Sequence, residues 1–199
     1  SSIVVANARL PVANMKELIA YAKNNPGKLN WASGGNNSNT HISIEVLKVA
    51  TGIDVVHVPY KGTPPALTDV ISGQADTMFT SVIASEAHIA SGRLKVMGVA
   101  GAKRHAAIPN VATFEEQGIR GANVYTWFGM VTTAKTPVAT IDILNAALNR
   151  ALAQPEIRQR LEHLGLEVAG GTPARFGAFM QDEADHLTRL VRRGALKME

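Results

Sequence analysis

One loop of the sequence combines two glycines with neutral side chains that can donate hydrogen bonds. It covers residues 33–39 and stands between a predicted strand at 29–32 and a predicted helix at 40–51. Glycine lets the backbone approach a ligand closely, and the free N–H groups that begin a helix favour an anion. The loop can therefore hold a small carboxylate without a lysine or arginine, although an ordinary turn with a helix cap explains the same residues. The candidate ligand-binding residues of this Gly-Asn loop are Ser33, Gly34, Gly35, Asn36, Asn37, Ser38 and Asn39.

A second loop leaves the end of a predicted apolar strand at residues 53–58. It contains Tyr60, Lys61, Gly62 and Thr63 and leads through two prolines into a predicted helix. Open parallel sheets bind ligands outside the carboxyl ends of their strands, so this Tyr-Lys loop is a candidate second wall of the site. Lys61 offers a positive charge and Tyr60 an aromatic face with a hydroxyl. The alternative is a surface turn with a solvated lysine.

Four further residues are candidates for contact with the same ligand. His41 lies in the first turn of the predicted helix, where bracing the loop is favoured over direct contact with a ligand. Ser81 ends the strand that Asp76 begins; we expect Ser81 to contact the ligand and Asp76 to fix the structure beside it. Trp127 lies in the longest predicted strand, residues 123–132, where it serves packing unless that strand crosses a ligand-binding cleft.

Catalytic and cofactor chemistry find little support in these residues. Ser33, His41 and Asp76 are the residue types of a hydrolase triad, but the G-x-S-x-G turn that exposes a nucleophilic serine is absent. The Gly-Asn loop lacks the Gly-Lys-Ser/Thr ending of a phosphate-binding loop and the spacing of a dinucleotide fingerprint. The six histidines are scattered and there is no cysteine, so we expect no metal site and no cofactor.

Composition narrows the class of protein. Of 199 residues, 46% are hydrophobic and 18% are charged, as is usual for a globular protein. The net charge of +4 is spread along the chain, without the basic cluster of a nucleic-acid-binding protein. No apolar run approaches the roughly 20 residues that span a bilayer, so we expect a protein that is not embedded in a membrane.

The elements that must position these loops alternate along the chain. Short β-branched runs are followed by amphipathic helices, which is typical of a layered α/β fold. We interpret residues 11–125 as one α/β lobe. From residue 126 the chain becomes mainly helical, with amphipathic patterns that begin at 136, 155 and 172, and a short strand is expected at 166–169.

Several short motifs occur together in this order. The most specific is Val56-His57-Val58-Pro59-Tyr60-Lys61-Gly62, and the others include Ala32-Ser33-Gly34-Gly35, Gly73-Gln74-Ala75-Asp76 and Thr126-Trp127-Phe128-Gly129. With these motifs the whole sequence resembles the Bug or TctC family, the extracytoplasmic solute receptors of tripartite tricarboxylate transporters. The resemblance implies a two-lobed fold of the type II periplasmic-binding-protein class, with a small carboxylate bound in the cleft.

The resemblance also implies a division of the chain. Residues 1–10 correspond to a crossover strand from the first lobe, 11–125 to an essentially complete second lobe, and 126–199 to the return crossover strand and the C-terminal helical part of the first lobe. Family chains carry a signal peptide and most of the first lobe before the point where this sequence starts, so we expect an N-terminally truncated receptor.

The function implied is that of a periplasmic, non-catalytic receptor. It would capture a dicarboxylate, tricarboxylate, aromatic acid or acidic amino acid and deliver it to membrane transporter subunits, with no nucleic-acid partner. In the family, ligand-facing positions match the Gly-Asn loop, the Tyr-Lys loop, Asp76 and Ser81. Two alternatives stay open: a small hydrolase or transferase that uses Ser33 or Ser81 with His41, and a ligand-sensing module.

Overall fold

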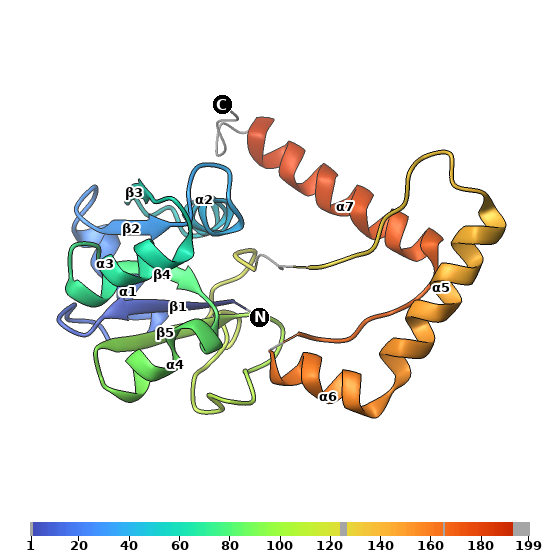
Figure 1. Ribbon diagram of the computed structural model, residues 1–199. Helices are drawn as coiled ribbons and strands as arrows, with labels where there is room; N and C mark the ends of the chain where they lie inside the picture. Colours follow the sequence, from blue (N-terminus) through green and yellow to red (C-terminus); the bar gives the residue numbers. More distant parts are fainter. Residues whose placement is uncertain (1, 124–126, 165, 193–199) are drawn as a thin grey trace. The chain divides into compact units, whose positions relative to one another are not determined.

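The computed structural model describes residues 2–123, 127–164 and 166–192, which belong to two compact units (Figure 1). The first unit contains the described residues up to 123, and the second runs from Trp127 to Arg192. The expectation of an α/β fold is confirmed in the first unit, and the second is helical. The assignment of these parts to the lobes of a receptor stays a prediction.

A five-stranded mixed sheet forms the centre of the first unit, with the strand order β3-β2-β4-β1-β5. The neighbours β3, β2 and β4 are parallel, whereas β1 is antiparallel to both β4 and β5. The first strand therefore lies in the middle of this sheet. The strands are β1 (Ser2–Asn7), β2 (Asn30–Ser33), β3 (Val56–Pro59), β4 (Thr77–Thr80) and β5 (Leu94–Ala100).

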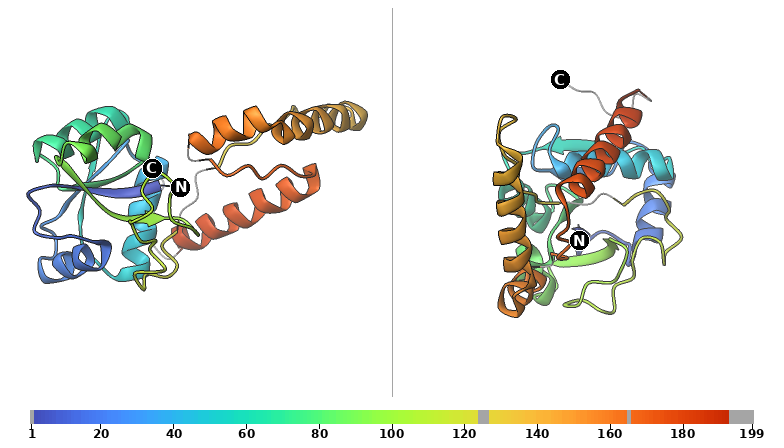
Figure 2. Two further views of the ribbon diagram at one scale, coloured as in Figure 1. Left: turned by 90° about the horizontal axis from the view of Figure 1, so that it is seen from below. Right: turned by 90° about the vertical axis from the view of Figure 1, so that its right-hand side faces the viewer.

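Helices cover both faces of the sheet because successive side chains of a strand point to opposite faces. On one face Val4, Trp31 and Phe79 pack with apolar residues of α1 and α2, and on the other Ile3, Val5 and Met78 pack with those of α3 and α4. The left view of Figure 2 shows the sheet edge-on between these helix pairs. The helices are α1 (Met15–Asn24), α2 (Asn39–Thr51), α3 (Thr63–Ser72) and α4 (Val82–Ala90).

The second unit contains three helices, α5 (Val138–Ala153), α6 (Pro155–His163) and α7 (Pro173–Arg192). The Asn149 side chain ties the connection before α7 to α5, because its amide donates to the Gly171 carbonyl oxygen at 2.9 Å and its oxygen accepts from the Gly171 N–H at 2.8 Å. No residue of α5 or α6 is buried, and the side chain of Ile143 is 68% exposed. Val138 and Leu144 of α5 are exposed as well.

Two expected strands are wrong over their described residues. Residues 127–132 and 166–169 are irregular rather than extended in a sheet. Alternating apolar residues suggested strands, but no neighbouring strand among the described residues provides the ladder of hydrogen bonds that a strand requires. Residues 124–126 of the first expected strand lie outside the described residues.

The sequence Thr113-Phe114-Glu115-Glu116 predicts the capping box of a short helix, but the chain forms only a turn there. The two capping bonds are nevertheless present. The Thr113 N–H donates to Glu116 Oε2 at 2.8 Å, and the Glu116 N–H donates to Thr113 Oγ1 at 3.1 Å. Across the described part of the chain, no helix is both long and apolar enough to cross a membrane.

Candidate functional site

The three parallel strands end at one edge of the sheet, which we name the carboxyl edge. Strand β2 leads through the Gly-Asn loop into α2, β3 leads through the Tyr-Lys loop into α3, and β4 leads through Ser81 into α4. Because the strands are parallel, the three helices begin at the same edge. The N-terminus of a helix carries a partial positive charge and unpaired N–H groups, so the carboxyl edge favours a bound anion.

Backbone hydrogen bonds hold the two loops against each other. The Tyr60 N–H donates to the Ser33 carbonyl oxygen at 3.0 Å, and the Gly62 N–H donates to the Gly34 carbonyl oxygen at 3.1 Å. The approach is close enough to require glycine: a Cβ on Gly35 would lie 3.0 Å from the Tyr60 carbonyl oxygen, and the φ of Gly35 is +126°. The structure therefore brings together the two loops that the sequence singled out.

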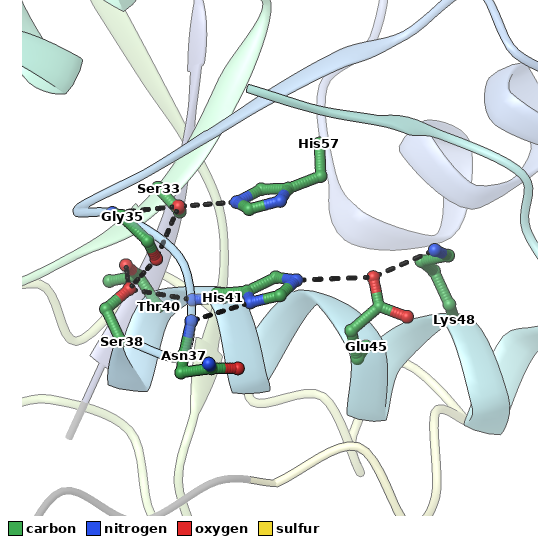
Figure 3. A network of polar contacts seen from close by, with 9 residues as sticks. All are labelled: Ser33, Gly35, Asn37, Ser38, Thr40, His41, Glu45, Lys48 and His57. Atoms are coloured by element: carbon green, nitrogen blue, oxygen red, sulfur yellow. Dashed lines mark hydrogen bonds and ion pairs between the residues drawn. The ribbon is translucent and has the colours of Figure 1, made fainter. Parts of the chain in front are cut away.

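Inside the Gly-Asn loop, side-chain oxygens hold the backbone in a tight turn (Figure 3). The Ser38 hydroxyl donates to the Gly35 carbonyl oxygen at 2.7 Å and accepts from the His41 N–H at 3.3 Å, which caps α2. Thr40 Oγ1 accepts from the Gly34 N–H at 2.9 Å. These hydroxyls are consumed within the protein, so they shape the loop rather than offer donors to a ligand.

Two histidines form a stack beneath this loop. The rings of His41 and His57 are nearly parallel, 5° apart, with centroids separated by 3.9 Å. His41 Nδ1 accepts the Asn37 N–H at 3.0 Å, and His57 Nε2 shares a hydrogen bond of 2.6 Å with the Ser33 hydroxyl. Figure 3 shows both contacts, with His41 on α2 and His57 on β3. His41 thus braces the loop, which is the role that the sequence favoured.

The environment keeps both imidazoles neutral near pH 7. Burial, together with the nearby charges of His41 and Lys48, lowers the pKa of His57 from 6.5 to about 4. Burial also lowers the pKa of His41, and the carboxylate of Glu45 only partly opposes this effect. Glu45 lies 3.9 Å from His41 Nε2, but it is already paired with Lys48 at 2.8 Å.

Two hydroxyls expected to face the ligand have partners within the protein. The Tyr60 hydroxyl donates to Asp69 Oδ2 at 2.7 Å, and burial together with this contact raises the pKa of Tyr60 to about 12. Ser81 Oγ accepts the Ala84 N–H at 3.2 Å and caps α4. Lys61 is exposed at the carboxyl edge. That any of these residues contacts a ligand stays a prediction.

The expected position of Asp76 beside the two loops is wrong. Asp76 precedes β4, whereas both loops follow their strands, so it lies at the opposite edge of the sheet. Its carboxylate accepts the Asn30 N–H at 2.7 Å, and its own N–H donates to the Asn30 carbonyl oxygen at 3.0 Å. It therefore fixes the start of β2, which is the structural role expected from the sequence, and it cannot complete a triad with Ser33 and His41.

Trp127 belongs to the second unit and packs there. Its ring meets those of Phe176 and Phe179 edge-to-face, at centroid distances of 5.6 and 5.5 Å. These contacts fit the packing role, and contact with a ligand stays a prediction. Among the described residues, no cluster of three histidine, aspartate or glutamate side chains could hold a metal ion.

His57, Thr40 and Glu45 belong to this network but were not predicted from the sequence as site residues. His57 was noted only as part of a family motif. A polar residue inside an otherwise apolar run, next to the loop motif, was the available signal. Its partners His41 and Ser33 are distant in sequence, so the pairing itself could not be seen.

Comparison with known proteins places this fold and its loops in a family. The model of the Tripartite tricarboxylate transporter family receptor matches residues 1–196. The chain belongs to this TctC receptor family. A UPF0065 protein from the tcbD–tcbE intergenic region of a Pseudomonas species is 32% identical over 191 residues, which are 96% of this chain and 57% of that protein. Protein BugT of Bordetella pertussis is 27% identical over 99% of this chain and 60% of its own length. This TctC-family chain thus spans less than two thirds of the length of both relatives.

Solved structures agree with the assignment of the chain to the TctC family. The periplasmic binding protein BugD has a TM-score of 0.83 at 30% identity, over 99% of this chain and 67% of that one. The structure of R. palustris Rpa4515 with adipate has a TM-score of 0.85 at 26% identity, over 98% of this chain and 65% of that one. The structure of MatC from Rhodopseudomonas palustris with bound malate has a TM-score of 0.79 at 29% identity, over 93% of this chain and 64% of that one. The expected fold class is confirmed, and the TctC family consists of receptors rather than enzymes.

Proposed function

We propose that this chain is the carboxylate-binding part of a periplasmic solute receptor that serves a tripartite tricarboxylate transporter. The observation that carries the proposal is the pair of helix starts held side by side at the carboxyl edge. Among the described residues, the backbone N–H groups of Asn39, Thr40 and Thr63 donate no hydrogen bond. A carboxylate oxygen accepts such N–H groups well, because the two helix dipoles add to the attraction.

Binding by neutral groups suits a receptor that must release its ligand. A buried ion pair loses much of its gain to desolvation, whereas preorganised N–H donors need no charged partner. The hydroxyls and imidazoles beneath the loop hold these donors in place before the ligand arrives. Two relatives of similar fold were solved with adipate and malate, and both are small dicarboxylic acids. This similarity supports a dicarboxylate as the ligand class.

A serine-dependent hydrolase is disfavoured by the burial of its nucleophile. Ser33 is 0% exposed, so its hydroxyl cannot attack a bound substrate in this structure. Its partner His57 stacks on His41, and within the described residues no carboxylate hydrogen-bonds to the His57 ring. The Ser33–His57 contact therefore serves to position the loop.

Calorimetric titration with adipate, malate and citrate tests the proposal. The control ligand is hexane-1,6-diol, which matches adipate in length but carries no charge. We expect saturable heat with at least one acid and none with the diol. The absence of binding to every acid would overturn the proposed function.

A pair of glycine variants locates the binding. A Cβ on Gly34 would lie 3.4 Å from the Thr63 nitrogen, so Gly34→Val covers that N–H and should lower affinity at least tenfold. Gly177→Val is the matched control, because a Cβ on Gly177 meets nothing within 4 Å. Equal affinity in the two variants would place the carboxylate elsewhere.

A further inference from the structure

We propose that His41 is a pH-sensitive switch for the Gly-Asn loop, which keeps its anion-binding shape only while the His41 ring is neutral. The inference rests on the proposed function and adds regulation by pH to it. Three features support it: one hydrogen bond, one backbone conformation and one stack of rings. Figure 3 shows the hydrogen bond and the two rings.

The hydrogen bond requires an unprotonated nitrogen. The Asn37 N–H donates to His41 Nδ1 at 3.0 Å, so the ring proton of neutral His41 is on Nε2, the atom that faces Glu45. A second proton can be added only at Nδ1. The two N–H groups would then point at each other, and the bond between loop and helix would be lost.

Asn37 depends on this bond. With a φ of +58°, it is the one non-glycine residue in the left-handed region among those the structure describes. Asparagine tolerates this conformation better than most residues, but the conformation persists only where the surroundings hold it. Ser38, which caps α2, follows directly. Release of Asn37 therefore disturbs the turn that presents the N–H groups of Asn39 and Thr40.

Only a proton on His41 breaks a contact with the loop. Two cationic rings 3.9 Å apart would repel, so the pair accepts a second proton less easily than a first. The Glu45 carboxylate, 3.9 Å from His41 Nε2, favours the first proton on His41 rather than on His57. A proton on His57 would leave its contact with Ser33 intact, because the serine hydroxyl can accept from Nε2 and donate to the Gly35 carbonyl oxygen. A proton on His41 instead removes the bond from the Asn37 N–H.

The charged groups around the two histidines set the pH at which the switch operates. On α2, Glu45 favours a proton on His41 and Lys48 opposes it, while β3 contributes only His57 and β2 the neutral Ser33. Burial outweighs Glu45 and lowers the pKa of His41 below 6.5, in agreement with the geometry. The loop is therefore held at neutral pH and released in acid.

The test compares two histidine variants of the same design. In His41→Asn, the side-chain oxygen can accept the Asn37 N–H in place of Nδ1 but does not titrate. His105→Asn is the control, because His105 Nδ1 also accepts a backbone N–H, from Ala107 at 3.2 Å, in a different loop. The first readout is the NMR shift of the Asn37 amide between pH 7.5 and 4, which needs no ligand. The second is adipate affinity over the same range.

We expect the Asn37 amide of the native chain and of His105→Asn to titrate with one midpoint below pH 6.5 and that of His41→Asn to stay constant. The affinity of the native chain for adipate should then fall up to tenfold for each pH unit below that midpoint. Protonation of adipate itself also weakens binding, and His41→Asn measures this contribution. The fall in the native chain should exceed the fall in His41→Asn. Unchanged amide shifts of the β-strands show that the fold persists.

Two results would overturn the switch: a native Asn37 amide that does not titrate, or one that titrates equally in His41→Asn. Stronger native binding in acid, absent from His41→Asn, would also overturn it, since His41 would then attract the ligand as a cation. If no acid binds at any pH, the proposed function fails, and the Asn37 amide still decides whether the switch exists.

Discussion

His57 should make folding sensitive to acid, and replacement by glutamine should reduce that sensitivity. The pKa of His57 is lowered from 6.5 to about 4 in the folded chain, chiefly by burial. Between pH 4 and pH 6.5 the unfolded chain binds more protons at His57 than the folded chain does. The contribution of His57 to the free energy of unfolding is therefore largest above pH 6.5 and declines as the pH falls toward 4. A shift of this size corresponds to between about 3 and about 4 kcal/mol for a fully buried ring, and the partial exposure of His57 reduces the expected loss at pH 4.5 to about 2 kcal/mol.

Urea unfolding of the native chain and of His57→Gln at pH 7 and pH 4.5 measures this loss. Glutamine Oε1 can accept the Ser33 hydroxyl in place of Nε2, so the variant keeps the contact without the titration. Carboxylates elsewhere titrate equally in both proteins, and their contribution cancels in the difference. We expect the native chain to lose about 2 kcal/mol more than the variant on acidification. Equal losses in the two proteins would refute the reasoning that burial of a neutral His57 contributes to folding.

Three substitutions test other parts of the first unit. Gly35→Ala places a Cβ 3.0 Å from the Tyr60 carbonyl oxygen at a residue of positive φ. The free energy of unfolding in urea should fall by about 1–3 kcal/mol, and adipate binding in calorimetry should weaken. Unchanged stability would show that the two loops can separate freely. Phe79→Ala removes a ring that is 1% exposed and stacks on Trp31 with centroids 5.5 Å apart. Thermal unfolding should show that the free energy of unfolding falls by about 3–5 kcal/mol. A fall below about 1 kcal/mol would contradict the role of this ring in the core. Ser38→Ala deletes both the cap of α2 and the bond to the Gly35 carbonyl oxygen, and it should cost about 1–2 kcal/mol in urea unfolding. Unchanged stability would contradict the role of Ser38 in holding the loop.

Local signals in the sequence were sufficient for most elements of the first unit. Strand β2 was expected within one residue of its observed bounds. Helix α2 began within one residue of its expected start, because Asn, Ser and Gly at helix ends act through neighbouring backbone groups. The two loops were expected together, since parallel strands end at one edge. The position of β1 between β4 and β5 depends on pairing across many residues and had no local signal.

The errors at the site share a physical cause. Asp76 was grouped with the loops although it precedes its strand, and the end of the strand at which a residue lies decides which edge of the sheet it reaches. Tyr60 and Ser81 were correctly placed at the carboxyl edge, but a sequence does not show that Asp69 and the Ala84 N–H already occupy their hydroxyls. The histidine stack was missed because it joins two elements that meet only in the folded chain.

The hydrogen bonds at the carboxyl edge separate the groups that shape the site from those that can select a ligand. The hydroxyls of Ser33 and Ser38 bond within the Gly-Asn loop, so changing them alters the loop before it alters any contact with an acid. Asn36, Asn39 and Lys61 are exposed, and no side-chain hydrogen bond holds them among the described residues. Backbone N–H groups recognise any carboxylate alike. With the proposed function, we therefore expect exposed side chains such as these three to contribute to discrimination between acids of different length or charge, and no side-chain hydrogen bond of the loop is lost when they are exchanged.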